Sequence, residues 1–399
     1  DGANDYVSAG AIGTVHTIEF WMNSGYVING AGPSRPLFNF NNLAAGFVWT
    51  NGSTNTVVGE TISLSTDNSF DNIYSNKTLS AGWHHIAFVS DGTRYTTVYI
   101  DGVSVATLNS NTGLDPPVIN ISSIQIGGRT STGHYYLGNI DELRFWNDIR
   151  TQTEIRDNMC RKLVGNEANL VSYYRFDGTT GTSLTDHAGT NTGTLNNMSN
   201  ADWVYSGAPI GNTSTHLYTG AWAGQQIFLV SPEGDSLGVS NVAGNPNGVH
   251  VYHVDELPND TTGIVGAGAN DHYFGVFKTG GAAPTYTGTY YYSENDAYQL
   301  GSHEPGMMTY IRDDNADVTW VNSGATLNTG TKTLTMTNLN TEIFLGNTIM
   351  ALPIELLKFD AKLNQDKVDL TWITLTEINN DYFTIERSAD TSKWEEVLT

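Results

Sequence analysis

The strongest structural signal in this sequence lies between Gly82 and Leu108. Two Asp-Gly pairs, Asp91-Gly92 and Asp101-Gly102, separate three short runs that are rich in Trp, Ile, Val, Tyr and Phe. Such a pair between apolar runs is typical of a tight hairpin, because glycine adopts a positive φ angle without a steric penalty. The stretch therefore predicts a three-stranded antiparallel meander with alternate side chains on opposite faces. In its middle strand one face holds Thr96, Val98 and Ile100, and the other holds Tyr95, Thr97 and Tyr99.

The rest of the chain shows the same alternation of strand-forming and turn-forming residues. Short runs of β-branched and aromatic residues alternate with clusters of Gly, Asn, Asp and Pro, and 42 of the 399 residues are Gly and 20 are Tyr. This composition favours strands and turns, so we expect an all-β protein. The length exceeds what one hydrophobic core of ordinary size accommodates and indicates two or three domains.

One helix is predicted, at residues 151–163. Thr151 and Glu154 have the spacing of a capping box, and Ile155, Met159 and Leu163 recur at the interval that places them on one helix face. The single cysteine, Cys160, should pack near that face as a small buried hydrophobe. One cysteine excludes an intrachain disulfide and a thiolate metal site.

The chain is strongly acidic. Asp and Glu outnumber Lys and Arg by 41 to 18, which gives a formal net charge of −23. A polyanion would be repelled, so neither nucleic acid nor insertion into an anionic membrane is expected. The sequence has no run that approaches the roughly 20 apolar residues of a membrane span. The first residues, DGANDYVSAG, are neither basic nor apolar, so we expect that a signal peptide was removed or never included.

Residues 1–205 carry a series of recognisable motifs. In chain order they are DGANDYV (1–7), TIEFWM (17–22), GWHHIAFVSDG (82–92), VYIDGVSVA (98–106), IQIGG (124–128), GNIDELRFWNDIRTQTEI (138–155) and LVSYYRFDGTTGTSLTDHAGTNTGTL (170–195). This series resembles the laminin-G-like, concanavalin-A-type jelly roll domains that are common in secreted bacterial proteins. The resemblance implies two antiparallel sheets packed face to face, which the strand pattern also favours.

Two further units follow. Residues 212–349 again alternate short strands and turns, which predicts a second β-sandwich similar to uncharacterised domains of secreted Bacteroidota proteins. Residues 351–399 resemble the fibronectin-III-like segment that precedes the sorting domain of proteins exported by the type IX secretion system. This last segment is shorter than the roughly 100 residues of a complete sandwich, so we expect a partial, truncated domain. An incomplete sandwich could also accept a strand from another copy of the chain.

The sequence offers no catalytic constellation. Retaining glycosidases of concanavalin-like architecture carry Glu-x-Asp-x-x-Glu, which places two carboxylates on one strand face, and this string is missing. Asp141 and Glu142 are adjacent and should lie on opposite faces of a strand. His84 and His85 on the meander should be packed or hydrogen-bonded rather than catalytic. We therefore expect a protein that is not an enzyme.

Calcium is the one cofactor that the sequence suggests. Ca²⁺ takes six to eight oxygen ligands, which Asp-rich and Asn-rich turns supply. In concanavalin-like folds a structural ion often ties the N-terminal segment to a late strand, and the residues that match are Asp1, Asp5 and Asp141. A second set contains Asp177, Asp186 and Asn191.

Ligand binding is expected at exposed aromatic rings, which stack on the apolar faces of sugars. The candidates in the second unit are Trp222, Tyr291 and Tyr298. In the run Tyr290–Tyr292 the faces must alternate, so at least one ring should be exposed. In the first unit the loops at residues 23–36 and 129–136 are the natural recognition surface.

The resemblance implies an extracellular, non-catalytic adhesion or ligand-binding protein of the cell surface, with glycans or surface glycoproteins as partners. Two alternatives stay open. The chain could be a structural stalk or filament subunit that contacts other copies of itself or the type IX secretion machinery. It could also represent accessory domains of a larger secreted hydrolase.

Overall fold

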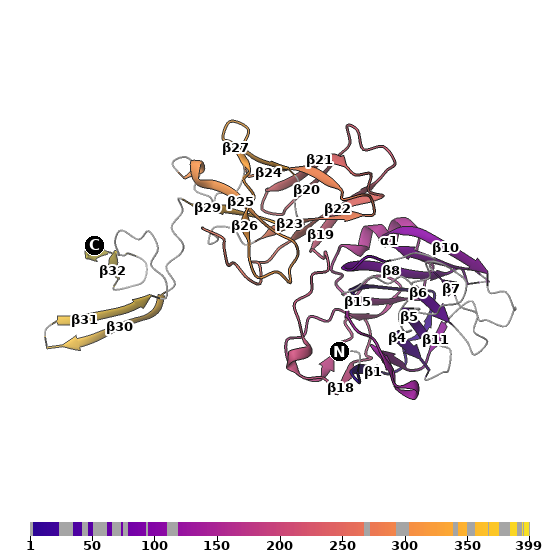
Figure 1. The fold of residues 1–399 in the computed structure, drawn as a ribbon. Helices are drawn as coiled ribbons and strands as arrows, with labels where there is room; N and C mark the ends of the chain where they lie inside the picture. The colour runs from indigo at the N-terminus through magenta and orange to yellow at the C-terminus, as the bar shows by residue number, and fades with distance from the viewer. Residues whose placement is uncertain are drawn as a thin grey trace.

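The computed structural model is a chain of packed β-sheets (Figure 1). It describes residues 3–23, 35–41, 47–50, 62–65, 73–74, 79–92, 95–109, 119–266, 272–292, 303–337, 342–348, 356–365, 367–374, 384–388, 393 and 395–398. Strands dominate these ranges, which confirms the predicted all-β class. Within them no helix is long and apolar enough to cross a membrane.

Two antiparallel sheets form the N-terminal unit. The eight-stranded sheet has the order β17 (Ser183–Leu184), β18 (Gly193–Asn196), β1 (Tyr6–Ala9), β12 (Ile124–Ile126), β4 (Arg35–Phe40), β5 (Phe47–Thr50), β6 (Ile62–Ser65), β7 (Ile73–Tyr74). The six-stranded sheet has the order β10 (Val103–Asn109), β9 (Tyr95–Ile100), β8 (Trp83–Ser90), β3 (Thr17–Asn23), β15 (Asn139–Trp146), β16 (Leu170–Tyr174). Two small pairs complete the unit, β2 (Gly13–Val15) with β11 (Ile119–Ile121) and β13 (Gly128–Arg129) with β14 (His134–Tyr135).

The predicted meander is present as β8, β9 and β10. Thr96, Val98 and Ile100 are buried while Thr97 and Tyr99 are half-buried, as the alternation predicts. At the second turn Asp101 and Gly102 have φ angles of 50° and 70°, the pair of left-handed residues that a tight hairpin turn requires. The inner faces of the two sheets enclose one core that includes Phe20, Phe38 and Phe145.

The predicted helix is α1 (Gln152–Met159). Its N-cap is Thr151, whose hydroxyl accepts from the Glu154 backbone N–H while the Glu154 carboxylate accepts from the Thr151 backbone N–H, so the predicted capping box is formed. Ile155 and Met159 are buried, and so is Cys160 just after the helix. Leu163 lies beyond the helix end and is buried with Trp146.

The second unit has two antiparallel sheets of its own around a core that includes Phe274 and Tyr290. One has the order β19 (Thr213–Tyr218), β22 (Gly248–Val254), β23 (Tyr273–Thr279), β29 (Glu342–Asn347), β25 (Met307–Arg312), β26 (Val321–Asn322). The other has the order β20 (Gln226–Val230), β21 (Ser236–Ala243), β24 (Thr285–Tyr291), β28 (Thr333–Thr337), β27 (Thr326–Asn328).

The two units pack directly on each other (Figure 1). The outer face of the six-stranded sheet and α1 meet the sheet that contains β19, β22 and β23. Trp21, Met159, Cys160 and Tyr252 form a buried apolar cluster there with Phe277 at its edge.

Beyond residue 355 the described strands form two hairpins. β30 (Leu356–Asn364) pairs with β31 (Lys367–Thr374), and β32 (Ile385–Arg387) pairs with β33 (Glu395–Leu398). Phe359, Leu363 and Val368 on the first hairpin are more than half exposed. The fibronectin-III-like nature of this segment stays a prediction.

Candidate functional site

A cleft of about 820 Å³ opens where the N-terminal unit, the second unit and the linker between them, residues 203–212, meet. The first unit contributes Asp141 and Glu142 from β15 together with the loop at residues 176–179. The linker contributes Trp203 to Ser206, and the second unit contributes residues from the loop after β22, Asn315 and Glu342. The cleft therefore exists only because the two units are docked.

A β-bulge brings two carboxylates to the floor of this cleft. In the pairing of β15 with β3, Asp141 lies opposite Trp21 and Arg144 lies opposite Glu19, so two residues of β15 face one residue of β3. Glu142 within the bulge has a left-handed φ of 51°. The expectation that Asp141 and Glu142 lie on opposite faces of a regular strand was wrong, because the bulge turns both side chains toward the cleft.

The two carboxylates have different surroundings. Burial, together with the charge of Glu142, raises the pKa of Asp141 to about 8, so this side chain is protonated at neutral pH. Burial also raises the pKa of Glu142, although Arg144 opposes this. Oε2 of Glu142 accepts hydrogen bonds of 2.5 Å from Arg144 Nη2 and from the Tyr173 hydroxyl. Glu142 is thus held in a fixed ion pair.

A third buried carboxylate, Glu342, stands on the wall that belongs to the second unit. Arg312 Nε donates to it at 2.6 Å and the Tyr252 hydroxyl donates at 3.2 Å. Burial nevertheless raises the pKa of Glu342 to about 7. The floor of the cleft therefore carries little free charge at neutral pH.

The linker provides the aromatic wall. Tyr205 is 61% exposed, and Trp203 is half-buried with its ring above Gly178. A methyl group on Gly178 would lie 2.7 Å from the indole, so glycine is needed for this close approach. Sequence reasoning missed both aromatic residues, although the run Trp203-Val204-Tyr205 at the end of the first predicted unit was the available signal.

Residues 1–156 match the sequence model of the concanavalin A-like lectin/glucanases superfamily. This match and the two packed sheets confirm the concanavalin-A-like fold of the first unit. No curated protein is similar to the sequence.

Several solved structures are similar to parts of the chain. One is a candidate carbohydrate-binding protein from Bacteroides ovatus, with 19% identity and a TM-score of 0.38 over 49% of this chain and 57% of that one. A heptameric pentraxin from Limulus polyphemus has 14% identity and a TM-score of 0.31 over 39% of this chain and 75% of its own. The ligand-binding domain of botulinum neurotoxin serotype D, solved with N-acetylneuraminic acid, has 9% identity and a TM-score of 0.31 over 87% and 86%. The chain thus spans little more than half of the Bacteroides protein.

Two of the predicted calcium ligands, Asp5 and Asp141, belong to different sheets of the concanavalin-A-like unit. Asp5 immediately precedes β1 in the eight-stranded sheet, whereas Asp141 lies in β15 of the six-stranded sheet and accepts the Glu142 backbone N–H at 2.8 Å. Asp1 lies outside the described residues, so calcium binding by this trio stays a prediction.

The second set of predicted calcium ligands is engaged elsewhere. Asp186 accepts hydrogen bonds from the Ser172 hydroxyl and from backbone N–H groups that include those of Tyr173 and Asn191. Asp177 forms an ion pair of 2.9 Å with Lys162. Asp186 therefore organises a turn, while Asp177 lines the cleft.

The three aromatic residues predicted to bind ligand have different surroundings. Trp222 is 6% exposed and donates from Nε1 to the Pro246 carbonyl, so its assignment as a sugar platform was wrong, because a core indole presents no face to a ligand. Tyr291 is 36% exposed and packs edge to face with the exposed Phe228, while Tyr290 on the alternate face is buried. Tyr298 lies outside the described residues.

The predicted recognition loops are described in part. Residues 24–34 of the first lie outside the described ranges. The second loop forms β13, the short helix η1 (Thr130–Thr132) and β14.

Proposed function

We propose that this chain is a non-catalytic carbohydrate-binding protein that acts outside the cell, and that it binds a glycan in the cleft between its two sandwiches. The observation that carries the proposal is the pairing of an aromatic wall, made by the half-buried Trp203 and the exposed Tyr205, with a floor of carboxylates and amides. A sugar ring has an apolar face and polar edges, and such a wall and floor match both. The superfamily match of residues 1–156 supports a lectin-type role.

The size of the cleft suits an oligosaccharide. Its volume of about 820 Å³ lies within the range of known small-molecule sites. Asp177 and Lys162 at the rim are partly exposed and can exchange their mutual ion pair for bonds to sugar hydroxyls. We extend the proposal to adhesion, with surface glycans or glycoproteins as targets.

The environment of the carboxylates supports a binding role over hydrolysis. Glycoside hydrolysis needs one carboxylate free to act as base or nucleophile beside a protonated partner. Asp141 would supply the protonated group, but Glu142 and Glu342 are each held by an arginine and a tyrosine. A role as base or nucleophile would require either carboxylate to leave its ion pair.

A glycan array on the full chain, followed by calorimetry with the best ligand, tests the proposal. We expect Tyr205→Ala and Trp203→Ala to weaken binding at least tenfold. Tyr291→Ala is the matched control. It removes an exposed aromatic ring of the second sandwich that does not line the cleft, so it should leave the affinity unchanged.

Two results would contradict the proposal. A silent array would reject glycan binding. Loss of affinity in Tyr291→Ala alone would move the site to the exposed face that Tyr291 shares with Phe228. A reducing-sugar assay on the ligand tests catalysis, and sugar release that Asp141→Asn abolishes would show that the protein is an enzyme.

A further inference from the structure

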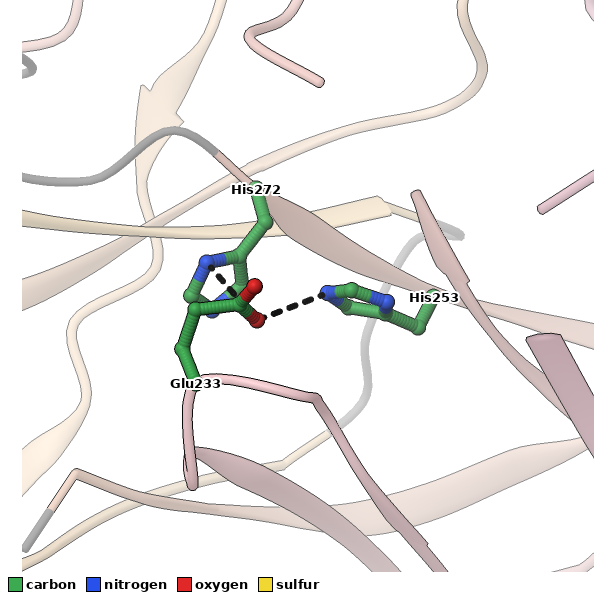
Figure 2. Close-up of side chains that lie close together, drawn as sticks. All are labelled: Glu233, His253 and His272. Carbon is green, nitrogen blue, oxygen red and sulfur yellow. Dashed lines mark ion pairs between the residues drawn. The ribbon is translucent and has the colours of Figure 1, made fainter. Parts of the chain in front are cut away.

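Three side chains of metal-ligand type converge at one end of the second sandwich (Figure 2). Oε2 of Glu233 lies 3.9 Å from Nε2 of His253 and 3.7 Å from Nδ1 of His272. One ligand atom from each residue lies within 4.8 Å of the others. Both histidines are fully buried, and the Glu233 side chain is 29% exposed.

Strand register explains why the histidines meet. His253 in β22 lies opposite Phe274 in β23, and His272 precedes Phe274 by two residues. The side chains of His253, His272 and Phe274 therefore share one face of the sheet, with His272 diagonal to His253. The two imidazole centroids are 5.0 Å apart.

Glu233 comes from the opposite sheet. It lies in the turn between β20 and β21, which is closed by a hydrogen bond of 2.8 Å from the Ser231 N–H to the Asp235 carbonyl. Gly234 next to it has a φ of 98°, a conformation that favours glycine. The cluster therefore bridges the two sheets at their open end.

One oxygen of the Glu233 carboxylate, Oε2, is shielded from solvent and lacks a hydrogen-bond donor within the part of the chain that the structure describes. Its separations from the two imidazoles exceed hydrogen-bond length. A buried carboxylate oxygen without a donor is costly, and a cation between the three groups would remove that cost.

A second carboxylate lies close to one of the imidazoles. Oδ2 of Asp235 lies 3.4 Å from Nε2 of His272, whereas Glu233 pairs with the other ring nitrogen, Nδ1. The Tyr290 hydroxyl donates to the same oxygen at 2.8 Å. Metal-binding histidines are typically oriented by such a carboxylate, which accepts the distal N–H and leaves the other nitrogen as the electron-pair donor.

We propose that Glu233, His253 and His272 bind one divalent transition-metal ion of the zinc class, with Asp235 orienting His272. Two imidazole nitrogens and one carboxylate oxygen are a zinc donor set, whereas Ca²⁺ requires six to eight oxygens. Ligand atoms of tetrahedral zinc are separated by about 3.4 Å, so the cluster needs only a small contraction to bind. The ion joins the β20–β21 turn to β22 and β23, and its remaining coordination position is filled by water or an external ligand.

The test uses the full chain without an affinity tag, freed of metal by a chelator and dialysed. Calorimetry and mass spectrometry with Zn²⁺ should show one ion per chain, and thermal unfolding should shift upward by about 5 °C at saturating zinc. Ca²⁺ and Mg²⁺ should produce neither effect. Absence of a stoichiometric zinc complex in the unaltered chain would overturn the proposal without any variant.

Variants locate the ion. Glu233→Gln keeps the shape of a partly exposed turn side chain and should lower zinc affinity at least tenfold, as should His253→Gln. His216→Gln is the matched control, because His216 is a partly buried histidine outside the cluster and its loss should leave the affinity unchanged. Unaltered affinity in Glu233→Gln, or an equal loss in His216→Gln, would reject this site. The site is independent of the proposed glycan cleft, so Tyr205→Ala should bind zinc normally.

Discussion

The indole of Trp21 and the ring of Phe277 meet edge to face across the junction of the two units, with centroids 5.1 Å apart and an interplanar angle of 78°. Trp21 is fully buried, and its Nε1 donates to the Met159 carbonyl at 2.7 Å. Nearby, the Tyr218 hydroxyl of the second unit donates to the Asp101 carbonyl at 2.9 Å. The meander and the helix of the first unit thus form the docking platform for the second unit, and this docking creates the cleft.

The aromatic contact should couple the stabilities of the two units. In a double-mutant cycle with Trp21→Leu and Phe277→Leu, we expect a coupling energy of about 1 kcal/mol, as is typical of edge-to-face pairs. Urea unfolding of the four proteins measures it. A control cycle pairs Trp21→Leu with Phe274→Leu. Phe274 lies in the core of the second sandwich, so this cycle should give a coupling energy near zero. Equal values in both cycles would show that the contact itself contributes nothing.

Arg144 should be among the most sensitive positions in the chain. It is fully buried, pairs with Glu142 at 2.5 Å and lies 3.6 Å from Glu19. Arg144→Met should lower the free energy of unfolding by roughly 3–5 kcal/mol, because two buried carboxylates lose their counter-charge. Urea unfolding measures the loss.

Two further variants test that explanation for Arg144. Adding Glu142→Gln and Glu19→Gln to Arg144→Met should recover part of the stability, because the uncompensated charges are removed. Arg387→Met is the control, since Arg387 forms an exposed pair of 3.8 Å with Glu395 and should cost less than about 1 kcal/mol. A similar cost at both arginines would contradict the role of burial.

The regular elements of this fold could be predicted because their signals are local. Asp101-Gly102 specifies a hairpin through backbone conformation, and Thr151 with Glu154 specifies a helix start within one turn. Strand alternation identified Val98 as a core residue and left Tyr291 exposed between two buried tyrosines. In each case the physical cause acts over a few residues.

The sites depend on contacts that a single sequence does not encode locally. The bulge that turns Asp141 and Glu142 to one side is defined by the register of β15 against β3, far away in the chain. The Glu233 cluster needs the β20–β21 turn of one sheet and the neighbouring strands β22 and β23 of the other. Trp222 is a residue type that often stacks on sugars, but it is buried in the core of the second unit.

His84 and Asp101 should make stability depend on pH. Burial opposes a charge on the His84 imidazole, but the Asp101 carboxylate, 2.8 Å from Nδ1, outweighs it and raises the pKa. The protonated His84 therefore stabilises the folded state. This contribution is fully present below about pH 6.5, the ordinary histidine pKa, and is lost as the pH rises through the higher pKa of the folded state. Asp101→Asn keeps the turn and the bond from the His85 N–H but removes the charge.

The expected difference for this pair is about 1 kcal/mol at pH 5.5, and it should vanish by pH 8.5. Urea unfolding at the two pH values measures it, and an NMR titration of His84 gives the pKa directly. A difference between the proteins that is constant with pH would mean that Asp101 acts through the turn geometry alone.

Asp141 should give the opposite kind of experiment, in which removing a buried titratable group stabilises the protein at high pH. Its pKa of about 8 in the folded state lies far above the ordinary value of 3.8. Between these values the folded chain binds a proton that the unfolded chain has lost, so the free energy of unfolding falls as the pH rises. The contribution of this one group is at most about 1.4 kcal/mol per pH unit.

Asp141→Asn keeps the acceptor for the Glu142 N–H and removes the titrating group. The variant should therefore show a flatter dependence of stability on pH between about pH 5 and 8 and exceed the unaltered chain at pH 8. Asp177→Asn is the control, because Asp177 lines the same cleft but is 49% exposed and should leave the slope nearly unchanged. Parallel stability curves for the Asp141 variant and the unaltered chain would place the Asp141 pKa near its ordinary value, and the acidic floor of the cleft would then be charged at neutral pH.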